Sequence, residues 1–169
     1  MAASKFLALV SGRIKEVIAT AVSTGIADDG KIVALGTDGR LDSSVMPVGI
    51  GAETKAIQAS ETLSAGDLVN IWDSGGTFKV RKADATAAGK EAHGFVLSAA
   101  NINTIATVYL EGTITGFTGL NPTRYYLSTT PGSITSNPPT GSGNVVQFIG
   151  PAVSSTEISF EATDGIVLA

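Results

Sequence analysis

The chain has 169 residues, of which 43% are hydrophobic and only 15% charged. This composition suits one compact domain, or a smaller domain with an appended arm, in a larger assembly better than an isolated monomer. The formal net charge of −4 argues against nucleic acid as a partner, and the absence of cysteine excludes disulfides, thiolate metal sites and cysteine nucleophiles.

The N-terminal segment is predicted to form short strands. Residues 6–10 and 14–22 are rich in apolar and β-branched side chains and are separated by Ser11 and Gly12. Because β-branched residues lose rotamer freedom in helices, we predict two strands, with one short helix as the alternative. The first run is too short for a signal-peptide core, and no stretch approaches the roughly 20 apolar residues that cross a bilayer. We therefore expect a soluble protein, made and assembled without export and with no membrane partner.

The following segment, residues 25–54, consists mainly of turn signals. Asp-Gly pairs flank one short apolar run at residues 32–35, and the segment has little amphipathic pattern of its own. We therefore expect residues 1–54 to form an extended N-terminal arm with short strands that lies across another surface.

The remainder, residues 55–169, shows short alternating apolar runs separated by Gly, Pro, Ser and Thr turns. This spacing predicts a mainly β protein whose second part is a small antiparallel β-sandwich or barrel. Residues 101–105 are compatible with a short helical turn. Residues 131–144 contain three prolines and several glycines, which predicts an exposed contact or tip loop without regular strand pairing. Its candidate contact residues are Pro138, Pro139 and Asn144.

Two motifs could bind ligands, but each has a simpler explanation. Gly49-Ile-Gly51 has only the first two glycines of a dinucleotide fingerprint, because Thr54 occupies the third position and no strand-to-helix unit follows. The acidic residues at 28, 29, 38 and 42 could attract calcium, yet they lack the ligand spacing of a helix-loop-helix calcium site. Turn chemistry explains both motifs, so we predict no cofactor and no metal site.

His93 is the single histidine, and Glu91 beside it could orient it as a general base. Catalysis would also require a nucleophile and an oxyanion site, and no Gly-x-Ser-x-Gly elbow occurs. A carboxylate pair or zinc cluster of the kind a cell-wall hydrolase needs cannot be assembled either. We therefore predict a structural hydrogen bond for His93, no catalytic residues and no enzymatic activity.

Two further groups of side chains have a structural and a binding interpretation. Lys79, Arg81 and Lys82 form the densest basic cluster, which is a solvated strand face by default and a contact for an acidic partner as the alternative. The side chains of Trp72, Tyr125 and Tyr126 could stack on sugars, but aromatic residues on strands more often fill cores or subunit contacts.

Short phrases along most of the chain resemble those of small structural proteins of tailed bacteriophages. The phrases are Lys5-Phe-Leu-Ala-Leu-Val-Ser-Gly-Arg13, Ala27-Asp-Asp-Gly-Lys-Ile-Val-Ala-Leu35, Asp38-Gly-Arg-Leu-Asp42, Met46-Pro-Val-Gly-Ile-Gly51, Leu63-Ser-Ala-Gly-Asp-Leu-Val69, Gly112-Thr-Ile-Thr-Gly-Phe-Thr-Gly119 and Tyr125-Tyr-Leu-Ser128. In size and organisation the chain looks like a head decoration, or capsid cement, protein.

This resemblance implies β-rich subunits, commonly homotrimers, on the outer surface of the capsid. Such subunits brace neighbouring major capsid proteins at three-fold and quasi-three-fold positions and so stabilise the capsid. The expected partners are the major capsid protein and other copies of this chain, in a virion assembled in the host cytoplasm. The arm is the first candidate for the capsid contact, by strand addition. Its candidate contact residues are Phe6, Ala8, Val10, Ile14 and Val17.

Tail-fibre and baseplate proteins have similar opening phrases, which gives a second possible function. Such a module would bind host surface glycans through residues 131–144 and exposed aromatic side chains. A fibre usually shows an extended repeat or a coiled-coil stalk, and neither is visible in this chain. The sequence therefore favours a head protein.

Overall fold

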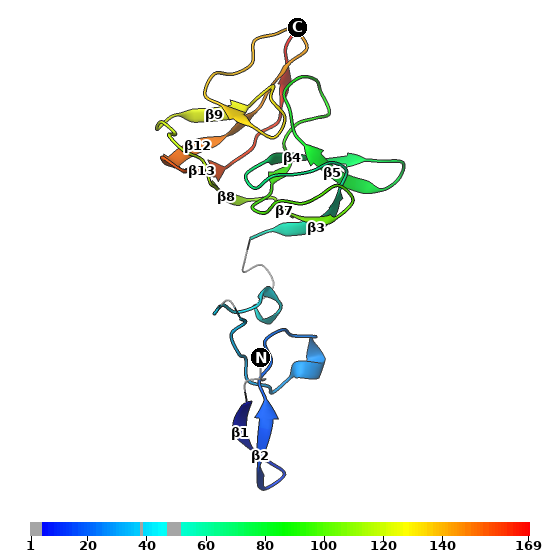
Figure 1. Cartoon of the computed structure of the whole chain (residues 1–169), viewed down its shortest axis with the longest axis vertical. Helices are drawn as coiled ribbons and strands as arrows, with labels where there is room; N and C mark the ends of the chain where they lie inside the picture. Colours follow the sequence, from blue (N-terminus) through cyan, green and yellow to red (C-terminus); the bar gives the residue numbers. More distant parts are fainter. Residues whose placement is uncertain (1–4, 38, 47–51) are drawn as a thin grey trace. The chain divides into compact units, whose positions relative to one another are not determined.

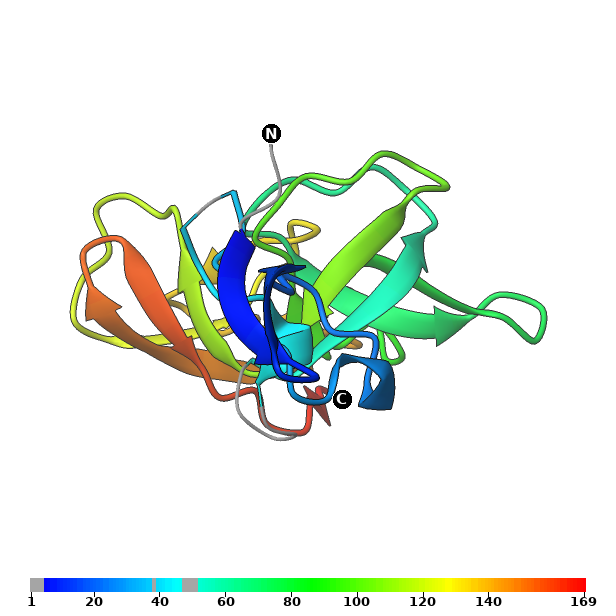
Figure 2. The same cartoon turned by 90° about the horizontal axis from the view of Figure 1, so that it is seen from below.

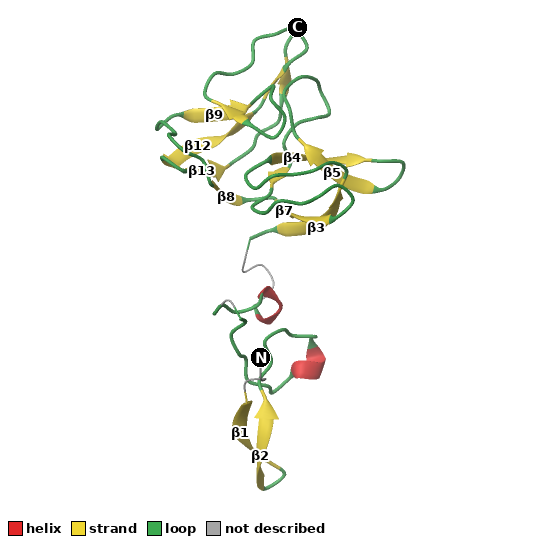
Figure 3. Cartoon of the chain, viewed as in Figure 1, coloured by secondary structure: helices red, strands yellow, loops and turns green. Residues whose placement is uncertain are grey.

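The computed structural model describes residues 5–37, 39–46 and 52–169 and is mainly β, as predicted (Figures 1 and 3). By its internal contacts the chain divides into two compact units, Met1–Gly51 and Ala52–Ala169. The glycine motif at 49–51 and the acidic residue at 38 lie outside the described residues.

The first unit begins with an antiparallel hairpin of β1 (Lys5–Val10) and β2 (Arg13–Ile18). Its two-residue turn has positive φ at both central positions, 52° at Ser11 and 76° at Gly12, which matches the right-handed twist of the strands. The strand prediction is confirmed over the helical alternative. However, β2 ends at Ile18, four residues before the predicted end.

The rest of the first unit is irregular and carries two single-turn helices, η1 (Ile26–Asp28) and η2 (Ser43–Val45). Beyond β2, Thr20 forms an isolated bridge with Val33, and its N–H donates to the Ile32 carbonyl at 2.9 Å. Every described side chain of this unit is exposed or half-buried. The described part of the unit therefore has no closed hydrophobic core.

The second unit begins with a closed five-stranded barrel in the order β3-β5-β4-β6-β7. Its strands are β3 (Thr54–Ala59), β4 (Leu68–Asp73), β5 (Phe78–Lys82), β6 (Gly94–Phe95) and β7 (Ile105–Tyr109). Although the prediction was antiparallel, β3 pairs with β5 in parallel. The chain reverses direction between β3 and β4 and again between β4 and β5. As a result β3 and β5 run in the same direction, and they pair in parallel where they meet in the barrel. The barrel interior consists of Ala59, Leu63, Val69, Val80, Val96, Ala100, Ala106 and Val108.

A five-stranded antiparallel sheet lies beside the barrel, in the order β10-β9-β12-β13-β8 (Figure 2). Its strands are β8 (Gly112–Thr115), β9 (Arg124–Leu127), β10 (Ile134–Thr135), β12 (Phe148–Ser154) and β13 (Glu157–Phe160). A separate two-stranded pair joins β11 (Val145–Val146) to β14 (Ile166–Val167). The second unit thus combines a barrel with a sheet packed on it.

Phe95 stands at the centre of the contact between barrel and sheet. Its ring stacks on Tyr109 and is tilted against Phe160, with both pairs of ring centroids 5.4 Å apart. The barrel side of this core includes Leu68, and the sheet side includes Ile114. Four of these five side chains are buried, and the fifth, Tyr109, is half-buried. The contact therefore joins the barrel and the sheet into one body.

Three local predictions require correction. Thr54, which was assigned to the arm, is the first residue of β3. Residues 101–105 are not helical, because Asn103 has a left-handed φ of 65° and Ile105 begins β7. The tip loop includes β10, which pairs with β9. This pairing is possible because the prolines at 131 and 138 lie outside the paired residues, so no ladder N–H is lost.

We expect Phe95→Ala to destabilise the second unit by about 3–5 kcal/mol, because it leaves a cavity at the junction of barrel and sheet. Urea unfolding followed by circular dichroism measures the loss. The matched control is Phe78→Ala, because Phe78 is 76% exposed and its truncation should change stability by no more than about 0.5 kcal/mol. Equal effects of the two substitutions would contradict the assigned core.

Candidate interaction surface

The hairpin has two faces of different chemistry, which its register defines. On the first, here called the basic face, Phe6 lies opposite Val17, Ala8 opposite Lys15, and Val10 opposite Arg13. On the second, the apolar face, Lys5 lies opposite Ile18, Leu7 opposite Glu16, and Leu9 opposite Ile14. Directly opposed residues of an antiparallel pair share a face, so the two sets point to opposite sides of the ribbon.

The basic face holds four of the five predicted arm contacts, at positions 6, 8, 10 and 17. Phe6, Ala8 and Val17 are half-buried, while Val10 is exposed. Arg13 and Lys15 add two cations on the same face, and no acidic residue accompanies them. The face is therefore amphipathic and positively charged, which suits contact with an acidic surface.

The fifth predicted contact, Ile14, lies on the apolar face. There the exposed fractions are 73% for Leu7, 74% for Leu9, 74% for Ile14 and 57% for Ile18. Lys5 forms an ion pair with Glu16, which balances the two charges of this face. Leu7 and Leu9 were not among the predicted contacts because those in β1 were taken at alternate positions from 6, although the run 6–10 is apolar at every position. Ile18 on β2 was not among them either.

Exposed apolar surface is concentrated in the first unit. A lone two-stranded hairpin is marginally stable in water, and residues 5–37 and 39–46 of the unit include no buried side chain to support it. Its large exposed apolar side chains make it the part of the chain best suited to being covered by a partner. They are Leu7, Leu9, Val10, Ile14, Ile18, Val22, Ile26, Ile32, Val33, Leu35, Leu41 and Met46.

Two of the acidic residues considered as calcium ligands, Asp28 and Asp42, make local structural contacts. Asp28 accepts hydrogen bonds from the Thr24 N–H at 2.5 Å, the Thr24 hydroxyl at 2.8 Å and the Lys31 Nζ at 2.6 Å. These donors, Lys31 first, lower the pKa of Asp28 from 3.8 to about 2. The Asp42 side chain caps η2 by accepting from the Ser44 N–H. Among the described residues, no three His, Asp or Glu side chains are grouped so that they could hold a metal ion.

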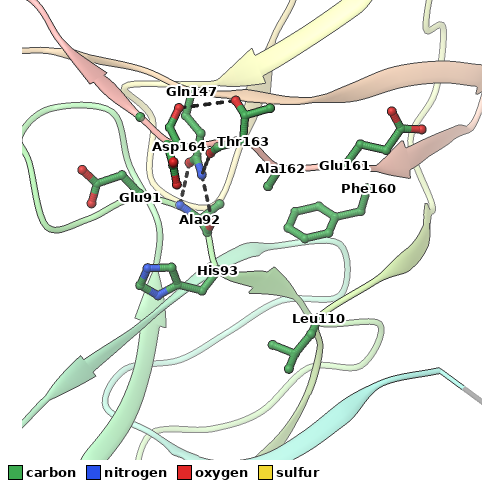
Figure 4. A pocket seen from close by; sticks show the side chains of 11 residues that line it. Glu91, Ala92, His93, Leu110, Gln147, Phe160, Glu161, Ala162, Thr163 and Asp164 are labelled. Carbon is green, nitrogen blue, oxygen red and sulfur yellow. Dashed lines mark hydrogen bonds between the residues drawn. The ribbon is translucent and has the colours of Figure 1, made fainter. Parts of the chain in front are cut away.

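A pocket of about 600 Å³ in the second unit includes both His93 and Glu91 (Figure 4). His93 is exposed, and its Nδ1 accepts a hydrogen bond from the Ile71 N–H at 3.1 Å, which confirms the predicted structural role. The Glu91 and Glu161 carboxylates lie at opposite sides of the pocket in Figure 4.

Gln147 connects the segments around this pocket and is only 3% exposed. Its Oε1 accepts from the Ala92 N–H at 2.7 Å, and its Nε2 donates to the carbonyls of Ala92 and Thr163, each at 2.9 Å (Figure 4). One amide thus joins the loop before β6 to the C-terminal segment. Nothing in the local pattern around residue 147 indicates this role, since its partners are distant in the sequence.

The basic cluster of β5 is used largely within the barrel. Arg81 donates to the Asn70 Oδ1 at 3.0 Å and the Gly89 carbonyl at 2.8 Å, and its guanidinium lies 4.9 Å from the centroid of Trp72. Lys82 pairs with Asp67 at 3.1 Å. These contacts stabilise the barrel and its neighbouring loop. Arg81 and Lys82 are therefore engaged within the unit, which weakens the interpretation that they bind an acidic partner.

The aromatic side chains considered for sugar stacking are likewise engaged. Trp72 is half-buried under Arg81 and donates through Nε1 to the Ser60 Oγ at 3.2 Å. Tyr125 is 7% exposed, and Tyr126 packs edge-on against Phe148. Tyr125 therefore lies in the interior, whereas Trp72 and Tyr126 are half-buried and packed against neighbouring side chains.

The three predicted tip residues differ in their exposure. Pro138 is exposed, whereas Pro139 and Asn144 are half-buried. The Asn144 carbonyl accepts from the Leu168 N–H, and the Gly143 N–H donates to the Leu168 carbonyl, both at 2.8 Å. Asn144 therefore anchors the loop to the C-terminal segment, and Pro138 is the member of the three that a partner could reach.

A comparison of the chain with protein-family models and with curated proteins finds no match. In the described part of the chain, no helix has the length and apolar character needed to cross a membrane.

We expect Gln147→Leu to lower the free energy of unfolding of the second unit by about 2–4 kcal/mol, because it leaves the buried N–H and carbonyl of Ala92 without partners and removes the bond to the Thr163 carbonyl. Chemical denaturation measures the change. Gln58→Leu is the control, because Gln58 is half-buried and its Nε2 donates one hydrogen bond, to the Asn103 carbonyl. A loss no larger than that of the control would show that water replaces the Gln147 contacts.

The lowered pKa of Asp28 predicts a pH dependence of the first unit. The folded pKa of about 2 lies below the ordinary 3.8, so the stabilisation is complete above the ordinary value and is lost as the pH falls from about 3.8 to about 2. An NMR titration of the Asp28 carboxyl should show the low midpoint, and Lys31→Met should raise it. Lys15→Met is the control and should leave the midpoint unchanged. A midpoint near 3.8 in the unmodified protein would refute the assigned contacts.

Proposed function

We propose that this protein is a non-enzymatic structural protein of a phage virion that decorates and cements the outer surface of the capsid. It bridges major capsid proteins at three-fold and quasi-three-fold sites and assembles as a homotrimer. The capsid role comes from the resemblance of the short phrases. The observation that carries the proposal is the contrast between a closed, packed body and an N-terminal unit whose apolar and basic hairpin is uncovered.

The second unit has the properties of a rigid brace. Barrel and sheet share one core around Phe95, and every buried side-chain N or O in the described residues has a hydrogen-bond partner. The described part of the first unit has no such core, and contact with another surface would supply burial. Modest contacts of this kind become tight when symmetry repeats them, because the second engagement costs less than the first.

The hairpin offers two ways to engage a capsid subunit. Its basic face, with Arg13 and Lys15, suits an acidic surface. Because β1 and β2 form a two-stranded sheet, each strand also has one edge with no strand partner among the described residues. Strand addition at such an edge supplies backbone hydrogen bonds, and alternate side chains supply specificity.

The alternative is a tail-fibre or baseplate module that binds host surface glycans. Such a site needs aromatic platforms. Of the aromatic residues considered for stacking, Trp72 lies under Arg81 and Tyr125 is buried, although Phe78 is exposed. The exposed Pro138 remains available on the tip loop. The positions of Trp72 and Tyr125 favour a contact with a capsid protein over the binding of a glycan.

The deciding experiment is the binding of purified protein to expanded capsids that lack it, with occupancy and position determined by cryo-electron microscopy. Density at the three-fold and quasi-three-fold sites is the expected result. Absence of binding to heads, together with binding to tails or host cells, would reject the capsid role and make Pro138 the next residue to mutate.

We expect the double variant Arg13→Glu and Lys15→Glu to bind capsids at least about tenfold more weakly, because it reverses the charge of the basic face. Deletion of residues 2–20 should abolish attachment while the second unit stays folded. A quantitative capsid pull-down measures binding, and circular dichroism checks folding. Lys55→Glu with Lys79→Glu is the charge-matched control on the barrel and should bind normally. Full binding by the deletion variant would remove the arm from the contact.

A further inference from the structure

We propose that the apolar face of the hairpin, formed by Leu7, Leu9, Ile14 and Ile18, packs against the same face of other copies of this chain. The inference rests on the proposed function only in that both require an oligomer. The apolar face belongs to the hairpin alone, and self-association can be measured on purified protein without capsids, so the two proposals can fail separately.

The four side chains form one continuous surface. Leu9 and Ile14 are directly opposed across the ribbon, and Leu7 is the next residue along β1 on the same face. Ile18 lies diagonally from Leu7, where long side chains of neighbouring strands still touch. All four are more than half exposed, and the described part of the first unit has no core that could take them in.

Charge distinguishes what can cover each face. On the apolar face the Lys5–Glu16 ion pair leaves no net charge, so two copies can approach through it without repulsion. The basic face carries Arg13 and Lys15 with no acidic residue, so two copies would repel each other there. An acidic partner would select the basic face for the same reason. The apolar face therefore suits a neutral apolar surface, and another copy presents one of identical size and chemistry.

The dimensions of the face set the strength of this association. Strands of six residues are about 20 Å long, and a two-stranded ribbon is about 10 Å wide. This area is well below the roughly 800 Å² per partner of a standard stable interface. Hairpin contacts alone should therefore give an association that depends on concentration, and contacts elsewhere in the oligomer would have to add to it.

The arrangement is compatible with simultaneous contact to a second partner. The two faces of a ribbon point in opposite directions, so copies that meet through their apolar faces keep Arg13 and Lys15 on the outside. One hairpin can then hold its sister copies on one side and an acidic surface on the other.

The absence of cysteine permits a site-specific crosslinking test on the full-length protein. Leu9→Cys places a thiol on the apolar face, and Ala8→Cys, one residue earlier on the same strand, places it on the basic face. With a short bismaleimide, the protein carrying Leu9→Cys should form covalent dimers at least ten times faster than the protein carrying Ala8→Cys. Equal rates, or no crosslinking at residue 9, would overturn the proposal.

Sedimentation velocity over a range of protein concentrations supplies an independent measurement. The unmodified chain should self-associate, and Leu7→Ser with Leu9→Ser should shift the midpoint at least tenfold toward higher concentration. The control is Ile105→Ser with Val153→Ser, which also replaces two exposed apolar side chains, but in the second unit, and should leave the midpoint unchanged. The proposed contact would be refuted if the protein were monomeric at all concentrations. It would also be refuted if the substitutions at residues 7 and 9 left the association midpoint unchanged. If those substitutions instead weaken only capsid binding, the apolar face belongs to the capsid contact.

Discussion

The apolar contact between barrel and sheet is the interaction on which the second unit depends. Phe95 reaches from the barrel to Phe160 of the sheet and stacks on Tyr109. Burial of such aromatic surface is the main favourable term that offsets the entropy of ordering two β layers. Gln147 makes the packing more specific. Its buried amide forms all of its hydrogen bonds only when the loop before β6 and the C-terminal segment are both in place.

The described part of the first unit does not meet the same requirement for burial. Its described side chains include many large aliphatic groups and none that is fully buried. The short-range contacts it does have, such as those of Asp28 with Thr24 and Lys31, are exposed hydrogen bonds of modest worth. Covering the hairpin would supply the missing burial, and its basic and apolar faces differ enough in charge to select different partners. The proposed capsid role and the proposed contact between copies both follow from this division.

Sequence reasoning succeeded where the signal was local and failed where it depended on register. The two hairpin strands follow from their β-branched residues and the intervening Ser11 and Gly12. Four of the five predicted arm contacts share a face, but Ile14 does not, because the two-residue turn pairs it with Leu9 and not with Val10. Alternation within each strand cannot supply that pairing. Likewise, Arg81 resembled part of a solvated cluster until the fold brought Asn70 and Gly89 to its guanidinium.

The sequence by itself determined the mainly β class and the positions of most strands. It also determined the change from a turn-rich N-terminal part to a second part with regularly spaced strands. These features arise from side-chain periodicity and turn residues within a few positions of one another. Only the tertiary structure decided the parallel closure of β3 on β5, the union of barrel and sheet, and the partners of Gln147, which lies 55 residues from Ala92. The physical reason is that pairing and burial between distant segments depend on which surfaces meet in the folded chain, and no local pattern contains that information.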